Sequence, residues 1–143
     1  MSETSPNPNQ GSQTEKGFLP LDGWLENKRQ LFKRLSPEEA FAAFGQGAWL
    51  IDTRPLEKKI ASGLIPGALE IRLDILPWRI HPDAENHEVD IKPEDLVIVL
   101  CDHGYSSSVA AAELLELGFN ATDVEGGYQA WMAAGLPWQP YQV

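Results

Sequence analysis

The sequence predicts an α/β fold, in which helices cover both faces of a mostly parallel β-sheet. Three observations support this prediction. Short, nearly all-apolar segments alternate with segments of helical periodicity. The clearest unit, residues 96–118, runs from five consecutive apolar residues through a short polar loop into an amphipathic helix. The length of 143 residues and the 43% hydrophobic content suit one domain that buries a sizeable core.

The N-terminal composition and the net charge limit the domain organisation and the partners. Residues 1–17 are polar and rich in proline, so we expect a disordered tail ahead of one domain over residues 18–143. A net charge of −10 disfavours nucleic acid or an anionic membrane as a partner. No apolar run approaches the roughly 20 residues of a membrane-spanning helix. The N-terminus has no signal-peptide pattern, so we expect a cytoplasmic protein.

The first half of the chain begins with a helical stripe. Residues 18–30 carry apolar and basic side chains at helical spacing, which indicates a helix that packs on its own domain or one that meets a membrane surface or partner. Ser36, Pro37 and Glu39 form the capping box of a second helix. The next elements are a strand, a helix, a strand and a helical turn, over residues 48–51, 55–61, 68–71 and 73–78.

The second half begins with a long polar loop over residues 81–95. Its histidines and carboxylates could be drawn as metal ligands, but their spacing matches no known site, and we expect a solvated loop and no metal. The elements that follow are a strand, a helix, a strand and a helix, over residues 96–100, 106–117, 121–124 and 127–134. We expect no cofactor, because neither a dinucleotide-binding nor a Walker glycine motif is present.

The only cysteine, Cys101, follows an expected strand directly. Asp52 and Arg54 follow another strand in the same way. Ligands bind at the carboxyl ends of parallel strands, so we expect these side chains at one candidate site. A single cysteine excludes an internal disulfide and a multi-cysteine zinc site, and it fits a reducing compartment.

The loop after Cys101 combines a glycine with hydroxyl side chains. Gly104 allows a turn in which successive amide groups converge on an anion, and Ser106 and Ser107 add hydroxyl donors. These groups and the start of the next helix favour a reactive thiolate. Asp102 opposes a thiolate unless its carboxylate is directed to solvent. The alternative is a buried, unreactive cysteine that acts as a small hydrophobic residue.

Four motifs, in order, resemble a known family. The loop Cys101–Ser107, CDHGYSS, resembles the active-site loop of the single-domain rhodaneses, the thiosulfate sulfurtransferases. Residues 50–54 resemble the family's strand that ends in Asp-x-Arg, and residues 63–68 resemble its Gly-His-Ile-Pro-Gly-Ala turn. Residues 126–131 and 135–137 resemble its closing Gly-Gly-x-x-Ala-Trp and Gly-x-Pro. Together they cover about residues 31–137, the core of the expected domain.

The resemblance implies a rhodanese-like fold of five mostly parallel strands, with residues 31–35 as a short first strand. It implies that Cys101 takes the outer sulfur of a donor such as thiosulfate, as a persulfide, and passes it to a thiol or a sulfur-carrier protein. The implied anion-binding loop is Asp102, His103, Gly104, Tyr105, Ser106 and Ser107. The persulfide charge would be stabilised by the loop amides and hydroxyls.

The loop departs from the family in having no cation. Arg72 and Arg79 are candidate replacements for substrate binding, or surface partners of the acidic loop over residues 81–95. Asp52 and Arg54 are a structural ion pair near the site or, alternatively, substrate contacts. The missing cation leaves a second reading open, a catalytically weak rhodanese-like module that binds a partner or senses oxidants.

A phosphatase is a further alternative. The related dual-specificity phosphatases carry an arginine six positions after the cysteine, where it clamps phosphate with two hydrogen bonds. Here that position is Ser107, so the transition-state clamp is missing.

Overall fold

The computed structural model describes residues 17–142. The helices are α1 (Leu21–Arg29), α2 (Pro37–Gly45), α3 (Leu56–Ser62), α4 (Leu76–Ile80), α5 (Ser106–Glu116) and α6 (Gly127–Ala133), with a 3₁₀ helix η1 (Leu73–Ile75). The strands are β1 (Trp49–Asp52), β2 (Leu69–Glu70), β3 (Leu96–Leu100) and β4 (Asn120–Asp123). The expected tail lies outside the described residues, apart from Gly17.

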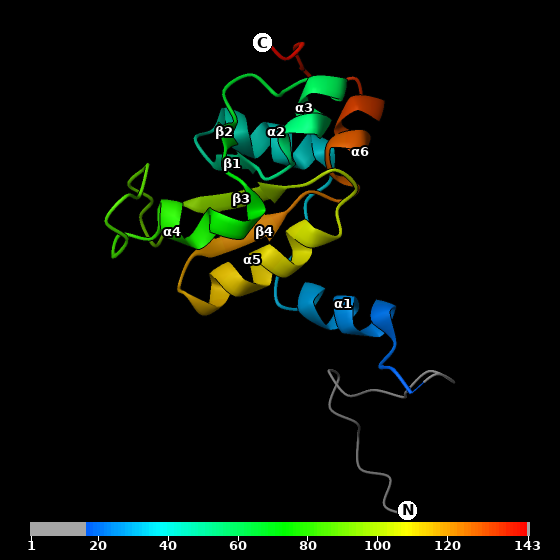
Figure 1. Ribbon diagram of the computed structural model, residues 1–143, viewed down its shortest axis with the longest axis vertical. Helices are drawn as coiled ribbons and strands as arrows, with labels where there is room; N and C mark the ends of the chain where they lie inside the picture. The colour runs from blue at the N-terminus through cyan, green and yellow to red at the C-terminus, as the bar shows by residue number, and fades with distance from the viewer. Residues whose placement is uncertain (1–16, 143) are drawn as a thin grey trace, which may run out of the picture.

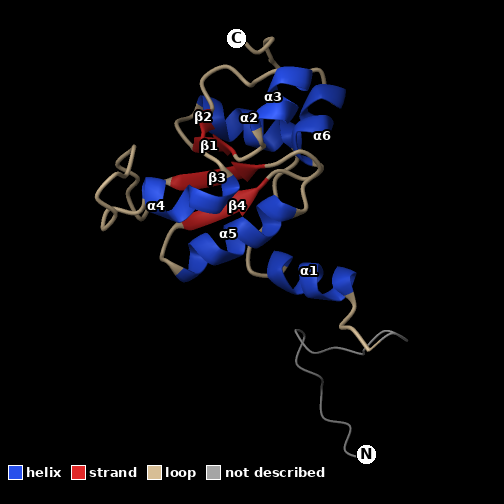
Figure 2. Ribbon diagram, in the orientation of Figure 1, coloured by secondary structure: helices blue, strands red, loops and turns tan. Residues whose placement is uncertain are grey.

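The sheet has the order β2-β1-β3-β4, and every pair is parallel. Helices cover both of its faces (Figures 1 and 2). One face packs Leu50, Ile98 and Leu100 against Tyr128 and Trp131 of α6 and against α2. The other face packs the alternate residues of β1 and β3 against α4 and α5. The prediction of a parallel sheet buried on both faces is therefore confirmed.

The sheet has four strands among the described residues, so the expected fifth strand over residues 31–35 is wrong. Only Leu35 pairs, in one parallel bridge with Val124 at the edge beside β4. Leu31 and Phe32 donate to Lys28 and Arg29 in a turn that follows α1. Two residues after Leu35, α2 begins at its capping box, so no residues remain to extend the bridge into a strand.

Helix α1 packs on its own domain. It contacts α5, and Leu25 is its buried residue (Figure 1). This is the first of the two readings of the N-terminal stripe. In residues 17–142, no helix has both the length and the hydropathy to cross a membrane.

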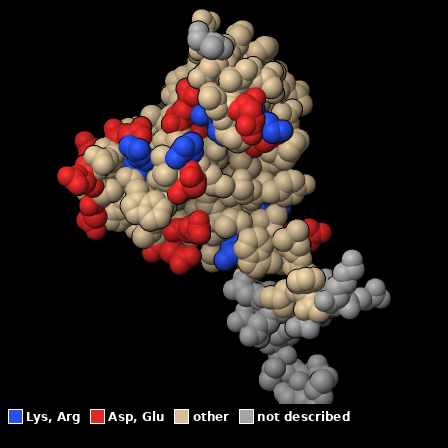
Figure 3. Space-filling view, viewed as in Figure 1, with Lys and Arg blue, Asp and Glu red and all other residues tan. Residues whose placement is uncertain are grey.

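The loop over residues 81–95 contains neither helix nor strand. Its carboxylates belong to the acidic surface in Figure 3. His81 pairs with Asp83 and His87 with Asp90. Nowhere in residues 17–142 do three histidine, cysteine or carboxylate side chains gather as metal ligands would.

Candidate active site

The carboxyl ends of three neighbouring strands bring the site together. Asp52 ends β1, Asp123 ends β4, and Cys101 follows β3 between them. This is the sheet edge at which parallel α/β folds bind ligands. Asp123 was missed in the sequence, because the expected strand over residues 121–124 placed it inside the strand, whereas β4 ends at this residue.

The thiol of Cys101 is surrounded by hydrogen-bonding groups of the loop. The amides of Gly104 and Ser107 donate to Sγ at 3.1 Å and 3.3 Å. The thiol lies 3.2 Å from the hydroxyl oxygen of Ser107, to which it donates. Cys101 is 6% exposed, but it lines an open pocket. Amide donors directed at sulfur stabilise a negative charge there.

The loop's carbonyl oxygens are anchored on other elements. Cys101 and Asp102 accept from the amides of Tyr128 and Gln129 in α6 at 2.8 Å and 3.1 Å. The carbonyl of Gly104 accepts from arginines in the N-terminal segment. In a trans peptide the N–H lies opposite the C=O, so the amides of residues 102, 103 and 105 are directed away from these anchors. Within residues 17–142, those three amides have no acceptor.

Gly104 has the left-handed backbone that the tight loop requires, with φ of +86°. A Cβ atom there would also lie 2.8 Å from the amide nitrogen of Gly126 and 3.1 Å from Nη2 of Arg34. Backbone conformation and close approach therefore both select glycine at this position.

Arg29 and Arg34 brace the loop from outside. Nη2 of Arg29 and of Arg34 donate to the Gly104 carbonyl at 2.7 Å and 2.9 Å. Nε of Arg29 also donates to Ser108 at 2.9 Å. The sequence showed only a basic stripe here, and nothing local connects these arginines to a loop about 70 residues later.

The buried carboxylate of Asp123 organises the hydroxyls behind the thiol. It accepts from Ser107 at 2.8 Å and from Ser108 at 2.7 Å. Arg34 binds it with Nε and Nη2 at 2.8 Å and 3.1 Å. Ser107 has a single hydroxyl hydrogen, so it can donate either to Asp123 or to a charged sulfur. Asp123 keeps three other hydrogen bonds when that hydrogen turns to sulfur.

A pocket of about 380 Å³ opens beside the thiol. It is lined by Thr53, Arg54, Pro55, Lys58, Arg72, Leu73, Asp74, Cys101, Asp102 and Ser106. The structure therefore places Arg72 at the pocket, in an ion pair with Asp74 at 3.4 Å. Arg79 is not among the lining residues and pairs with Glu88 at 3.7 Å, as the surface alternative anticipated. Lys58, in the first turn of α3, is a lining cation that sequence reasoning missed.

The other polar loop side chains are directed to the surface or to α6. The carboxylate of Asp102 accepts from Nε2 of Gln129 at 2.9 Å and pairs with Lys58 at 3.6 Å and His103 at 3.3 Å. His103 is exposed. Tyr105 is 65% exposed and does not line the Cys101 pocket. The Asp102 charge is thus balanced by a cation at the pocket wall.

Asp52 and Arg54 form a buried ion pair, with Nη2 of Arg54 at 2.7 Å from Oδ2. Nη2 also donates to the Gly63 carbonyl at 2.8 Å, and the guanidinium lies 3.6 Å from the ring centre of Tyr128. Burial raises the pKa of the Tyr128 phenol, and the Arg54 charge partly opposes this. Among the buried side-chain nitrogen and oxygen atoms of residues 17–142, Nη1 of Arg54 alone has no hydrogen-bond partner.

Comparisons with known proteins agree with this fold. The family model described as "Rhodanese-like domain" matches residues 36–134. A curated relative, the thiosulfate sulfurtransferase GlpE of Pseudomonas entomophila (strain L48), is 37% identical over 106 residues, which cover 70% of this chain and 84% of the relative. The matched region begins after both arginines that contact the Gly104 carbonyl, Arg29 at the end of α1 and Arg34 ahead of α2.

Two solved structures share the fold. A protein of unknown function from Rhodopseudomonas palustris, described as a possible tyrosine phosphatase, has a TM-score of 0.74 at 23% identity, covering 90% of this chain and 99% of that one. The polysulfide-sulfur transferase of Wolinella succinogenes has a TM-score of 0.65 at 24% identity, covering 82% and 85%. At these identities the likeness supports the fold alone.

Proposed function

Because the chain belongs to the rhodanese-like domain family, we propose that it is a sulfurtransferase that carries sulfur on Cys101. The observation that carries the proposal is the pair of amide donors at Sγ, at 3.1 Å and 3.3 Å. The curated relatives named thiosulfate sulfurtransferase support the same reaction. The substrate is a small sulfur-containing donor, and the acceptor is a thiol or a sulfur-carrier protein.

In the first step, the Cys101 thiolate attacks the outer sulfur of thiosulfate. A bond forms between Sγ and that sulfur, the S–S bond of thiosulfate breaks, and sulfite leaves with the electron pair. The persulfide keeps one negative charge on its outer sulfur. The free amides of Asp102, His103 and Tyr105 supply hydrogen bonds for this charge, and they are already oriented by the anchored carbonyls.

In the second step, an acceptor thiolate attacks the outer sulfur of the persulfide. A bond forms between the two sulfurs, the Cys101–sulfur bond breaks, and Sγ regains its electron pair as a thiolate. The product is the persulfide of the acceptor. Cyanide can replace the thiolate and leaves as thiocyanate, which gives a convenient assay.

Lys58 and Arg72 supply the positive charge for an anionic donor at the pocket. They take the place of the cations that the loop lacks. Their own partners, Asp102 and Asp74, reduce this attraction. Thiosulfate, with two charges, is therefore a weaker donor here than it would be for a loop with its own cation.

A binding or redox-sensing module remains the second candidate, because the thiol is buried and the pocket cations are paired. Thiocyanate production from thiosulfate and cyanide separates the two. We expect turnover by the wild type and none by Cys101→Ser. If the wild type turns over neither thiosulfate nor an organic sulfane donor, the enzyme proposal is wrong and the module is favoured.

A further inference from the structure

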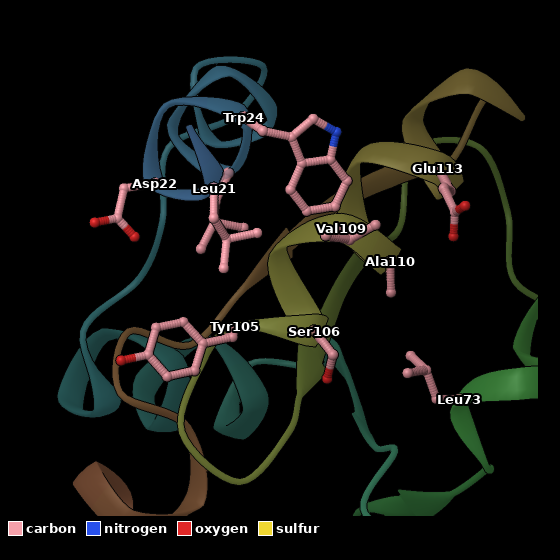
Figure 4. A pocket seen from close by; sticks show the side chains of 10 residues that line it. Leu21, Asp22, Trp24, Leu73, Tyr105, Ser106, Val109, Ala110 and Glu113 are labelled. Atoms are coloured by element: carbon pink, nitrogen blue, oxygen red, sulfur yellow. The ribbon is translucent and has the colours of Figure 1, made fainter. Parts of the chain in front are cut away.

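We propose that the groove between α1 and α5 binds the apolar organic body of a sulfur donor whose sulfur lies at Cys101. This inference rests on the proposed function and specifies its substrate class. The groove has a volume of about 590 Å³, within the range of roughly 300–1,000 Å³ typical of small-molecule sites (Figure 4). It is larger than the pocket of about 380 Å³ beside the thiol.

The groove has an apolar lining from three elements. Its apolar residues are Leu21, Trp24 and Leu25 of α1, Leu73 of η1, and Val109 and Ala110 of α5. Figure 4 shows Leu21, Trp24 and Val109 gathered on one side, with Leu73 across from Ala110. Hydrocarbon buried here leaves water without displacing ordered polar partners.

The groove adjoins the thiol pocket. Leu73 and Ser106 line both, so one molecule that passes these two residues would occupy both at once. Ser106 begins α5 within the same loop and helix unit that holds Cys101. A donor whose sulfur reaches Sγ therefore extends its remaining part into the groove.

The charges at the two ends differ. Lys58 and Arg72 line the thiol pocket together with their partners Asp102 and Asp74. The charged residues among those that line the groove are Asp22 and Glu113, both carboxylates. The arrangement complements a molecule that is anionic at its sulfur and uncharged along its body. A second anionic group in the groove would meet two carboxylates. An organic sulfane donor with one anionic end fits both requirements, and thiosulfate leaves the groove empty.

Thiosulfonates, R–SO₂–S⁻, provide matched probes. The Cys101 thiolate takes the outer sulfur, the S–S bond breaks, and the sulfinate R–SO₂⁻ leaves with the electron pair. The benzene and methane compounds share the reacting group and differ in R. Each rate of Cys101 persulfide formation is divided by the rate at which the same donor reacts with a free thiol such as glutathione. This normalised rate removes the difference in intrinsic reactivity between the two donors.

We expect the normalised rate to favour the benzene compound by at least about 10-fold in the wild type. Leu21→Gln removes an apolar wall from a residue that is 72% exposed, so the fold is retained. Val109→Phe narrows the groove from α5. Both variants should lower the preference for the benzene compound at least about 3-fold and leave the rate with the methane compound unchanged. The matched control, Leu117→Gln, changes an exposed leucine at the end of α5 outside the groove and should preserve the preference.

The groove proposal and the proposed function fail on different results. Equal normalised rates for the two donors, or a preference that survives in both groove variants, would overturn the groove while sulfur transfer stands. If neither donor adds sulfur to Cys101, the proposed function fails, and this inference fails with it.

Discussion

Nη2 of Arg29 donates a 2.7 Å hydrogen bond to the carbonyl oxygen of Gly104, and this bond ties α1 to the loop that holds the thiol. The amide of the same glycine donates to Sγ of Cys101 at 3.1 Å. One residue therefore connects the N-terminal helix to the sulfur. Helix α1 and Arg29 lie before residues 36–134, the region that the family model matches.

Arg29→Ala should slow alkylation of Cys101 by iodoacetamide about 10-fold, because the loop loses hydrogen bonds from a charged donor at Gly104 and Ser108. Arg29→Lys should restore part of the rate. Lys33→Ala is the control, since it removes a nearby charge from a side chain that is 81% exposed and contacts Glu39. If Lys33→Ala slows the reaction equally, the effect is one of net charge and not of loop position.

Gly104→Ala should destabilise the protein by more than Gly135→Ala, as measured by urea unfolding. Both glycines have positive φ, +86° and +72°, so each substitution introduces backbone strain of about 1 kcal/mol or more. A Cβ at Gly135 meets open space, whereas one at Gly104 meets the backbone of Gly126. We expect Gly104→Ala to cost about 1–3 kcal/mol beyond its control. Equal losses would contradict the close approach described for the loop.

Arg72→Ala should raise the KM for thiosulfate about 3-fold and change kcat little, because this exposed cation attracts the anion without touching the reacting sulfur. Added salt should reduce the difference. Arg79→Ala is the matched control, since its cation lies outside the pocket and pairs with Glu88. An equal rise in KM for both variants would show that only the overall charge matters.

Tyr128 should ionise above the usual phenol range of about 10. Burial raises its pKa, so the folded state favours the protonated phenol. The folded pKa exceeds the unfolded one, so this contribution to stability is complete below about pH 10 and is lost as pH rises through the folded value. Absorbance at 295 nm should show a late tyrosinate component that Tyr128→Phe removes and urea shifts down. A wild-type titration identical to that of the variant would contradict this prediction.

The parts of the fold that could be predicted were those with local signals. The apolar run at residues 96–100 identified β3, and the Ser36 capping box identified the start of α2. Residues 31–35 resembled a strand only through the family, and the turn after α1 together with the early start of α2 left a single bridge at Leu35.

The site was predictable where strand ends mark it. The ends of β1 and β3 led to Asp52 and Cys101. The expected strand over residues 121–124 ran past Asp123, where β4 ends, so Asp123 was not selected. The brace from Arg29 had no such signal, because it depends on how α1 docks on α5. Arg72 and Arg79 were indistinguishable in the sequence, and only the path of the chain through η1 and α4 separates them.

Intact mass spectrometry shows whether Cys101 carries sulfur. After incubation with thiosulfate or a thiosulfonate and removal of excess donor, the wild type should gain the mass of one sulfur atom. The gain should be absent in Cys101→Ser and reversed by cyanide. A wild-type mass that stays unchanged with every donor, or a gain that persists in Cys101→Ser, would rule out Cys101 as the sulfur carrier.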